Sequence, residues 1–386
     1  MHLATTARDL RLALEPFKKL VSGRSTIPIL ATVRIGNGEI RGTDLDQWLS
    51  VKLAATELSG SLCVPFHRLL QIARNLPPAA SLTLSSHGSA KTGFGAVLAF
   101  DGGRYLLPSI ASHDFPDAPK VDGPLKALPD TFLPGLDACA PFISTEETRY
   151  YLNGICLSKD PAAQGVLVST DGHRLAAHPC AHRVDGNPIL PRCAVETLRG
   201  LPPAGKAVFS ETRAAFQLPG ARFVTRLIDG GFPDWHRVVP KPAANAPRLC
   251  FDPADLDRLL RRLSGLSSDA GGSLEIAAKG DLVTLTRISA GPGDEGVERL
   301  DSGSCDNWPE GGATWSFRAR YLKDICRLHK GADRVRVTAK DFGSPAHITA
   351  EGRKTLTVLM PMRSDDSQAA RESLTALARP APAEAA

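Results

Sequence analysis

Three segments of this chain repeat one pattern at a nearly constant spacing. VPFHRLLQIAR begins at Val64, LPRCAVETLRG at Leu190 and FRARYLKDICR at Phe317, so successive starting positions differ by 190 − 64 = 126 and by 317 − 190 = 127. Apolar residues recur at matching positions in the three segments, as Leu69, Val195 and Leu322 and again as Ile72, Leu198 and Ile325. Self-similarity at a fixed period predicts three copies of one structural unit.

Shorter anchors follow nearly the same period. Thr43-Asp44 recurs as Thr170-Asp171 (170 − 43 = 127), and Phe115-Pro116-Asp117 recurs as Phe232-Pro233-Asp234 (232 − 115 = 117). Asp9-Leu10 recurs as Asp255-Leu256, and the difference of 255 − 9 = 246 is two steps of 123. Several anchors with one period make chance a poor explanation.

The length of the chain agrees with three units. It has 386 residues, and single cores stop growing at roughly 250 to 300 residues. Its hydrophobic content of 42% and charged content of 23% are typical of a soluble globular protein. Proline-rich stretches at 119–129 and 240–247 predict the junctions. We therefore expect domains at 1–121, 122–243 and 244–363, followed by a mobile Ala/Pro/charged tail at 364–386.

The chain is expected to be cytoplasmic. No window reaches the roughly 18 apolar residues of a membrane span, and the N-terminus lacks a signal-peptide core. Eight cysteines occur without a CxxC pair, so we expect small core hydrophobes and not a disulfide framework. The net charge of +5 permits a polyanionic partner without requiring one.

Helix signals alternate with strand signals. Thr6 with Asp9 predicts a capped helix that Pro16 disturbs, Asp252 with Pro253 predicts a second, and Pro134 predicts a short or kinked one. Eight runs read as short strands bounded by turns: ILATVRI, LSVKLAA, SLTLSS, GVLVST, RFVTRLI, LVTLTRI, VRVTA and TLTVLM. Short strands between turns favour antiparallel sheets, so each unit is expected to be α+β.

Catalytic and metal-binding patterns are weak. Ser169, Asp171, His173 and Arg174 form a polar cluster, but neighbours on a strand point to opposite faces, which favours a strand end with a turn over a triad. His178 and His182 lack a second ligand cluster at zinc spacing. No GxxxxGK[ST] loop is present. We expect a binding protein without cofactor or metal.

The predicted helices carry many basic residues opposite their apolar stripes: Arg8, Arg11, Lys18, Lys19, Arg68, Arg74, Arg192, Arg199, Arg258, Arg261, Arg262, Arg320, Lys323 and Arg327. Glu15, Glu196, Asp257 and Asp324 interrupt these faces. A solvated surface and a surface for phosphate contacts are both open interpretations.

Six segments resemble the bacterial sliding clamp, the β subunit of DNA polymerase III holoenzyme, and occur in the order of that family. They are STIPILATV at 25–33, GTDLD at 42–46, FISTEETRYYLNGI at 142–155, STDGHRLA at 169–176, LIDGGFPDWHRVVP at 227–240 and TVLMPMR at 357–363. The resemblance implies three tandem copies of the DNA-clamp fold, with helices lining a central hole and antiparallel sheets outside.

The resemblance also implies a function and partners. A head-to-tail homodimer would close a ring around double-stranded DNA and tether the polymerase, conferring processivity in replication without catalysis. The implied partners are the DNA polymerase III α subunit, the clamp-loader complex, and other polymerases and repair proteins that bind through a short peptide motif. The expected location is the cytoplasm, in association with the nucleoid.

The residues implied to form a peptide pocket are Leu152, Thr170, Gly172, His173, Arg174, Leu175, Pro233, Arg237, Val238, Tyr321, Val358, Leu359, Met360, Pro361, Met362 and Arg363. The implied DNA contacts are Arg24, Tyr150 and Tyr151, together with the helix residues Arg68, Arg74, Arg192, Arg199, Arg258 and Arg262, whereas Arg149 is expected to be structural. The implied dimer contact joins Tyr105 and Leu107 to Leu266.

The chain departs from the family pattern in four places. It continues past Arg363 to Ala386, carries Arg318 where asparagine is usual, is basic overall, and lacks the usual basic pattern in FGAVLAFDGGRYLLPSIASHDFP. A specialised paralogue that serves repair or translesion polymerases is the alternative. A DNA-processing hydrolase that uses Asp171 and His173 is a further, less favoured one.

Overall fold

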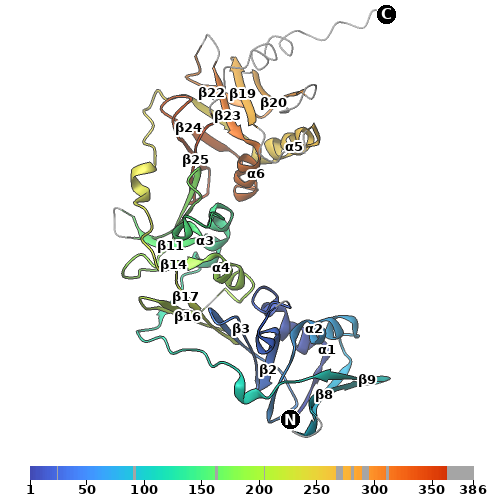
Figure 1. The fold of residues 1–386 in the computed structure, drawn as a ribbon. Coiled ribbons are helices and arrows are strands. Elements are labelled where there is room, and N and C mark those ends of the chain that lie inside the picture. Colours follow the sequence, from blue (N-terminus) through green and yellow to red (C-terminus); the bar gives the residue numbers. More distant parts are fainter. Residues whose placement is uncertain are drawn as a thin grey trace, which may run out of the picture. The chain divides into compact units, whose positions relative to one another are not determined.

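The computed structural model describes residues 1–23, 25–89, 93–160, 164–203, 205–266, 273–279, 282–288, 295–309 and 313–362. The chain divides into two compact units. Unit 1 comprises Met1–Asp137, Gly154–Lys159 and Cys180–Gly231, and unit 2 comprises Ala138–Asn153, Asp160–Pro179 and Phe232 onward. Both compact units are α+β, which is the class predicted for each of the three repeat copies (Figure 1). The domain limits expected from the sequence stay a prediction, and the expected tail at 364–386 lies outside the described residues.

Unit 1 contains short helices. They are α1 (Ala7–Leu14), α2 (Phe66–Asn75), α4 (Arg192–Leu198) and the 3₁₀ turns η1 (Glu15–Lys19), η2 (Pro28–Ala31) and η3 (Ser112–Asp114). Along the chain, α3 (Phe132–Cys139) begins in unit 1 and ends in unit 2. The predicted disturbance at Pro16 is confirmed, because α1 stops at Leu14 and continues as a 3₁₀ turn.

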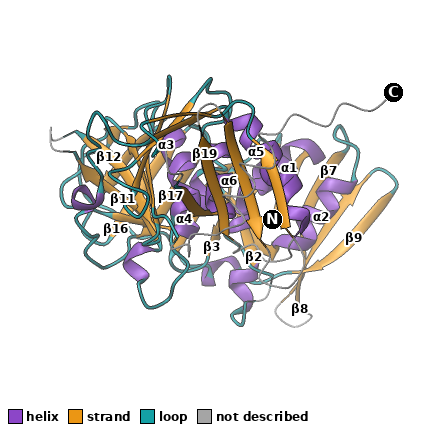
Figure 2. Cartoon of the chain, turned by 90° about the horizontal axis from the view of Figure 1, so that it is seen from above, coloured by secondary structure: helices purple, strands orange, loops and turns teal. Residues whose placement is uncertain are grey.

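The strands of unit 1 form antiparallel sheets. One has the order β5-β1-β7-β8-β9, a second has the order β10-β15-β16-β17-β4-β3-β2-β6, and β11 pairs with β14. Figure 2 shows β8 and β9 as a long hairpin. The bounds are β1 (His2–Thr6), β2 (Thr32–Gly36), β3 (Glu39–Thr43), β4 (Gln47–Lys52), β5 (Glu57–Ser59), β6 (Ser61–Pro65), β7 (Ser81–Ser89), β8 (Gly93–Phe100), β9 (Gly103–Pro108), β10 (Lys126–Ala127), β11 (Gly154–Lys159), β14 (Ile189–Pro191), β15 (Lys206–Phe209), β16 (Arg213–Leu218) and β17 (Ala221–Arg226).

Unit 2 is built in the same way. Its strands run in the orders β12-β13-β26-β25-β24-β18-β22 and β21-β20-β19-β23. Its helices are η4 (Ala140–Phe142), η5 (Tyr150–Leu152), η6 (Trp235–Val238), α5 (Pro253–Leu263), η7 (Ser264–Leu266) and α6 (Ala319–Leu328). Its strands are β12 (Gly165–Thr170), β13 (Arg174–Pro179), β18 (Arg248–Phe251), β19 (Ser273–Lys279), β20 (Leu282–Ile288), β21 (Glu295–Arg299), β22 (Ser304–Asp306), β23 (Thr314–Arg318), β24 (Val335–Thr338), β25 (Ala346–Ala350) and β26 (Leu356–Leu359).

The three repeated segments fold alike. Each is a strand that leads directly into a helix, as β6 into α2, β14 into α4 and β23 into α6. The helices begin at Phe66, Arg192 and Ala319, so their starting positions also differ by 192 − 66 = 126 and by 319 − 192 = 127. All eight runs predicted as strands contain a strand, but the first three residues of ILATVRI belong to the 3₁₀ turn η2, and β2 begins only at Thr32. The repeat read from the sequence is therefore a repeat of structure.

Side-chain caps start two of the helices as predicted. At α1, Thr6 Oγ1 accepts a hydrogen bond from the Asp9 backbone N–H at 3.1 Å and donates one to Asp9 Oδ2 at 2.7 Å. At α5, Asp252 Oδ1 accepts from the Ala254 N–H at 2.7 Å, with Pro253 at the first helical position. Such caps satisfy backbone donors that a helix N-terminus leaves open.

The cysteines belong mostly to the core. Six of the eight are buried, and burial raises the pKa of the Cys63 thiol to about 11 and that of Cys156 to about 12. Buried thiols of this kind stay neutral and behave as small hydrophobes. Within the described part of the chain, no helix is both long and apolar enough to cross a membrane.

One buried histidine makes the fold of unit 2 sensitive to acid. His329, just after α6, is 0% exposed, and neither ring nitrogen has a hydrogen-bond partner among the described residues. Burial, with Arg353 nearby, lowers the pKa of His329 to about 4. The unfolded chain takes up this proton near pH 6.5, so the unfolding free energy falls as the pH drops from about 6.5 towards 4.

His329→Leu is therefore expected to flatten the dependence of stability on pH. The wild-type chain should lose about 2 kcal/mol through this group between pH 7.5 and pH 5, and the variant should not. Urea denaturation midpoints at the two pH values measure the difference. The exposed His87→Leu is the control and should keep the wild-type slope. An unchanged slope in His329→Leu would contradict the assignment.

Candidate functional site

A cavity of about 250 Å³ lies on the surface of unit 2, beside the start of β13 (Arg174–Pro179). Its floor is apolar because Leu175 on β13 is directly opposite Val358 on β26, and both are buried. Pro233 and Trp235, at the start of η6, and Leu152 of η5 add to the lining. A concave apolar surface with a few polar groups at its edge is typical of a ligand site.

The apolar floor belongs to a larger cluster. Val166, Val168, Leu175, Ala177, Trp235 and Val358 pack together in the core, with Phe232, Val239 and Leu356 against them. Strand alternation explains the set, since every second residue of β12 and β13 points to this face. The cavity thus rests on a packed and rigid base.

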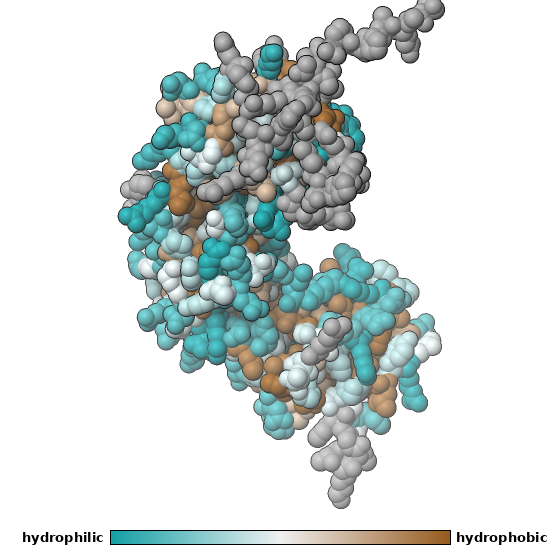
Figure 3. All heavy atoms as spheres, turned by 45° about the horizontal axis from the view of Figure 1, so that its top comes forward, coloured by the Kyte–Doolittle hydropathy of each residue, from teal (hydrophilic) through white to brown (hydrophobic). Residues whose placement is uncertain are grey.

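Exposed apolar residues at the edge of the cavity distinguish it from plain core. Val238 is 54% exposed and Met360 is 42% exposed, and both line the cavity. The face drawn in Figure 3 is largely hydrophilic, with apolar patches between polar regions. A thioether side chain at such an edge adapts to ligands of different shape.

A tight turn holds the polar edge of the cavity. Asp171 Oδ1 accepts hydrogen bonds from the backbone N–H groups of His173 and Arg174, both at 3.0 Å. Thr170 Oγ1 donates to the carbonyl oxygen of Arg174 at 2.8 Å. Directly after β26, the Met360 N–H donates to the carbonyl oxygen of His173 at 2.8 Å. These bonds fix the loop that carries His173.

Gly172 suits the centre of this turn. Its φ of +88° lies in the left-handed region, and a Cβ there would lie 2.6 Å from Arg149 Nη1. Arg149 itself is fixed by an ion pair with Glu146 at 2.6 Å. The arginine expected to be structural is therefore also part of the cavity wall.

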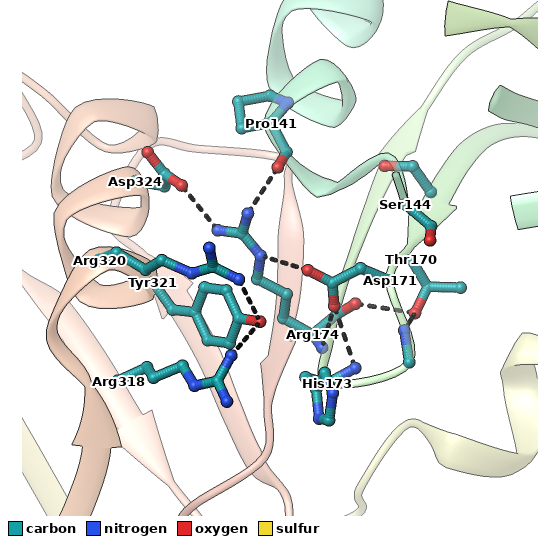
Figure 4. A network of polar contacts seen from close by, with 12 residues as sticks. Pro141, Ser144, Thr170, Asp171, His173, Arg174, Arg318, Arg320, Tyr321 and Asp324 are labelled. Carbon is teal, nitrogen blue, oxygen red and sulfur yellow. Dashed lines mark hydrogen bonds and ion pairs between the residues drawn. The ribbon is translucent and has the colours of Figure 1, made fainter. Parts of the chain in front are cut away.

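The guanidinium of Arg174 is the centre of a buried polar network (Figure 4). Its Nε donates to Asp171 Oδ2 at 3.0 Å, Nη1 to Asp324 Oδ2 at 2.8 Å and Nη2 to the Pro141 carbonyl oxygen at 2.7 Å. Its Cζ lies 4.2 Å from the ring centroid of Tyr321 and 4.9 Å from that of Phe142. Arg174 is only 8% exposed, so this network, with two cation–π contacts, compensates for burying the charge.

Ten of the sixteen residues predicted for the pocket line this one cavity: Leu152, Thr170, Gly172, His173, Arg174, Leu175, Pro233, Val238, Val358 and Met360. Leu359 points to the other face of β26 and is fully buried, and Tyr321 is buried behind Arg174. Arg237 has an 84% exposed side chain beside Asp234. Pro361 and Met362 do not line the cavity, and Arg363 lies outside the described residues.

Sequence reasoning missed four lining residues of this cavity. Trp235 and Asp234 line it, although only their neighbours were predicted; Tyr151 was assigned to DNA, and Arg149 was expected to be structural. The signal that could have found Trp235 is its place in FPDW, two residues after Pro233. Arg318, the unusual residue in the sequence, donates from Nη1 to the Tyr321 hydroxyl at 3.5 Å.

Ser169, Asp171 and His173 are not arranged as a catalytic triad. Ser169 is buried, and its hydroxyl donates to the carbonyl oxygen of Cys139 at 2.6 Å. Asp171 binds Arg174 and the turn, and His173 is exposed at the cavity. A nucleophile needs a base within hydrogen-bond reach. Among the described residues, no three His, Cys, Asp or Glu side chains are arranged to hold a metal ion.

Four of the nine residues predicted to contact DNA are engaged in ion pairs with other described residues of the chain. Arg74 pairs with Glu15 at 3.0 Å and Arg199 with Asp137 at 2.5 Å, and close pairs join Arg258 to Asp255 and Arg262 to Glu298. Arg192 is half-buried, while Arg68 is exposed and has no ion-pair partner among the described residues. Tyr150 is 54% exposed, and Arg24 lies outside the described residues.

The residues predicted for a dimer contact are placed on an edge. β9 is the outer strand of its sheet, where Tyr105 is 47% exposed and Leu106 is 67% exposed. Leu107 is only 5% exposed, although it lies on the same face of β9 as Tyr105. The exposed leucine of this strand is therefore Leu106. Leu266 ends η7, and its side chain lies outside the described set.

Arg174→Ala tests the network beneath the cavity. The change leaves Asp171, Asp324 and the Pro141 carbonyl without their shared donor, so stability should fall by about 3 to 5 kcal/mol. Thermal or urea denaturation of the full chain measures it. Arg327→Ala is the matched control, because Arg327 pairs with the same Asp324 at 3.6 Å but its side chain is 63% exposed. That change should cost less than about 1 kcal/mol, and equal losses in both variants would refute the special role of Arg174.

The chain matches known proteins over nearly its whole length. The family model of the DNA polymerase III beta subunit, central domain, matches residues 135–234. The beta sliding clamp of Caulobacter vibrioides is 32% identical over 346 residues, covering 84% of this chain and 90% of that protein. The beta sliding clamp of Escherichia coli is 25% identical over 371 residues, covering 91% and 97%.

Solved structures agree in fold. The beta sliding clamp of Caulobacter crescentus superposes with a TM-score of 0.82 at 27% identity, covering 94% of this chain and 99% of that one. The sliding clamp, DNA polymerase III subunit beta, of Bartonella birtlesii bound to griselimycin gives a TM-score of 0.81 at 27% identity, covering 94% and 100%.

Proposed function

The chain belongs to the bacterial β sliding clamp family, and from that premise we propose how its described parts serve a processivity clamp of DNA polymerase III. The protein acts in DNA replication by keeping the polymerase on its template. The observation that carries this function is the 32% identity with a β sliding clamp over 84% of the chain. The proposed mode of action is binding without catalysis, and the commitment of Asp171 to Arg174 supports it.

The proposed assembly is a homodimer that closes a ring around double-stranded DNA. Three domains per chain, at 1–121, 122–243 and 244–363, would give six domains in the dimer. A head-to-tail arrangement closes into a ring when the rotation from one domain to the next is a whole fraction of a full turn. The edge strand β9, with Tyr105 and Leu106 exposed, is the proposed contact for the region of Leu266 in a second copy. A ring of this kind stays on DNA by topology and does not need tight binding.

Contact with DNA is proposed to be diffuse. Arg68, Arg74, Arg192, Arg199, Arg258 and Arg262, with Arg24, Tyr150 and Tyr151, are the candidates. Because acidic neighbours already pair with several of these arginines, their attraction for phosphates is weakened. Phosphate contacts carry no sequence register, so weak ones suit a protein that slides.

The cavity of unit 2 is proposed to receive a short linear peptide. Its apolar floor of Leu175 and Val358, the exposed edge residues Val238 and Met360, and the adjacent His173 support this role. The proposed partners are the DNA polymerase III α subunit, the clamp-loader complex, and other polymerases and repair proteins that present such a peptide. We place the protein in the cytoplasm, in association with the nucleoid.

Encirclement has a direct test. A clamp loader with ATP loads the protein onto nicked circular DNA. The DNA is linearised in one sample and left circular in another, and gel filtration then separates DNA-bound protein from free protein. A ring should remain on the circle and slide off the free ends. Blocking the ends with bound protein should restore retention, which provides the control. Equal retention on circular and open linear DNA would overturn the ring.

The double variant Val238→Ala with Met360→Ala tests the peptide site. Both side chains are exposed at the cavity edge, so their loss should weaken the binding of a polymerase C-terminal peptide at least tenfold without unfolding the chain. Fluorescence anisotropy with the labelled peptide measures it. Leu12→Ala, an equally exposed leucine at 54% in unit 1, is the control. Unchanged affinity in the double variant would place the site elsewhere.

A further inference from the structure

Unit 1 holds a second cavity constructed like the one in unit 2. It has a volume of about 220 Å³, against about 250 Å³ for the first. Trp48 of β4, Val224 of β17 and the segment Phe115-Pro116-Asp117 line it. All of its lining residues belong to unit 1.

The two cavities occupy the same place in the repeat. Trp48 is paired with Val224 across β4 and β17, just as Leu175 is paired with Val358 across β13 and β26. The positions of Trp48 and Leu175 differ by one step of the repeat, since 175 − 48 = 127. Phe115-Pro116-Asp117 lines the cavity of unit 1, and Pro233-Asp234 of the matching segment lines the cavity of unit 2.

The turn beside each cavity is built with the same bonds. Asp44 Oδ1 accepts from the backbone N–H groups of Asp46 at 3.0 Å and Gln47 at 2.6 Å, as Asp171 Oδ1 does from His173 and Arg174. Thr43 Oγ1 donates to the Gln47 carbonyl oxygen at 2.7 Å. Leu45 takes the left-handed conformation, with φ +77°, where unit 2 has Gly172.

The bond from this turn to a helix of the same unit is also repeated. Gln47 Oε1 accepts from Thr197 Oγ1 on α4 at 3.0 Å, and Arg174 donates to Asp324 on α6 at 2.8 Å. Both pairs are related by the same step, since 174 − 47 and 324 − 197 are each 127. The second cavity is therefore a structural counterpart of the first.

The cavities differ in where the indole comes from. In unit 2 the segment after the FPD motif supplies Trp235 and the strand supplies Leu175, whereas in unit 1 the corresponding positions are Ala118 and Trp48. Trp48 packs on Val208, Ala215 and Val224. The exchange keeps one large ring at each site, so an apolar surface is retained.

The charges at the second cavity favour an anionic ligand. Glu39 is bound by Arg41 and Ser50, and Asp117 accepts from Arg41 Nη1 at 3.2 Å. Arg222 also lines the cavity, is exposed, and has no ion-pair partner among the described residues. Glu39 and Asp117 share Arg41, and Arg34 Nη1 also lies 3.9 Å from Asp117 Oδ1, whereas Arg222 pairs with neither carboxylate and can therefore pair with a carboxylate of the ligand.

One hydrogen-bond donor at this cavity is also unsatisfied. The Nε1–H of Trp48 is buried and has no acceptor among the described residues. A buried donor without an acceptor costs free energy.

We propose that the cavity of Trp48, Val224, Pro116 and Arg222 is a second peptide-binding site, selective for a linear segment of a partner protein with an apolar side chain next to a carboxylate. The apolar side chain packs on Trp48 and Val224, and the carboxylate pairs with Arg222. The inference rests on the proposed function for the class of ligand, and it adds a second place on the same chain where that class binds.

Each cavity carries its own tryptophan, which makes the two sites separable in one experiment. The full chain is labelled with ¹⁵N-tryptophan, the four indole signals are assigned by Trp→Phe variants, and the peptide acetyl-Leu-Asp-Leu-Phe-amide is titrated in. We expect the signals of Trp48 and Trp235 both to shift, and those of Trp308 and Trp315 to stay. The same peptide with lysine in place of aspartate should not shift the Trp48 signal.

Arg222→Glu is the decisive variant, and Arg226→Glu is its matched control. Arg226 stands four residues further along the same strand, is exposed, and pairs with Asp46 outside the cavity. Arg222→Glu should raise the dissociation constant reported by Trp48 at least fivefold and leave that reported by Trp235 within twofold. Arg226→Glu should leave both unchanged.

The outcomes separate this inference from the proposed function. A response at Trp235 alone overturns the second site and leaves the first intact, whereas a response at Trp48 alone supports the second site and contradicts the first. An equal response to the lysine peptide overturns the selectivity. If Arg222→Glu changes the oligomeric state in sedimentation while the peptide leaves Trp48 unmoved, the cavity is a contact between copies and the proposal fails.

Discussion

The carboxylate of Asp171 is the constraint on which the candidate site depends. By accepting two backbone N–H groups it closes the turn between β12 and β13, and by binding Arg174 Nε it aligns the guanidinium with Asp324 and Pro141. A turn closed in this way sets the pairing of the strands that follow it. The register of β12 against β13, and with it the alternation that turns Leu175 towards the apolar floor, follows from this turn.

Two buried polar side chains, Gln47 and Arg174, stand at equivalent positions of the repeat and are satisfied by different partners. Gln47 is fully buried, and its amide donates to Asp44 and accepts from Thr197, so a neutral side chain is satisfied by neutral and charged partners. Arg174 carries a charge into a similar place and needs two carboxylates, a carbonyl and two aromatic rings. A buried ion pair is weak evidence for added stability, but it tolerates few alternative arrangements.

Much of the fold could be predicted, because periodicity and turn residues act locally. The strand–helix segments at Val64, Leu190 and Phe317 and the caps at Thr6 and Asp252 are of this kind. The pairing of Arg262 with Glu298 and the burial of Leu107 could not be predicted, because both depend on which strands are neighbours. Trp235 differs from these, because its place in FPDW is a local signal that could have been used. Ten cavity residues were predicted through family motifs, whereas their mutual packing comes only from the structure.

The exchange of indoles between Trp48 and Trp235 shows that the copies have diverged by compensation. Each space holds one bicyclic ring, delivered by the strand in one copy and by the connecting segment in the other. A chimera that transplanted Phe232–Trp235 onto Phe115–Ala118 would crowd two such rings into a volume evolved for one, and the reciprocal graft would leave a void. Neither segment can therefore replace the other without a matching change on the facing strand.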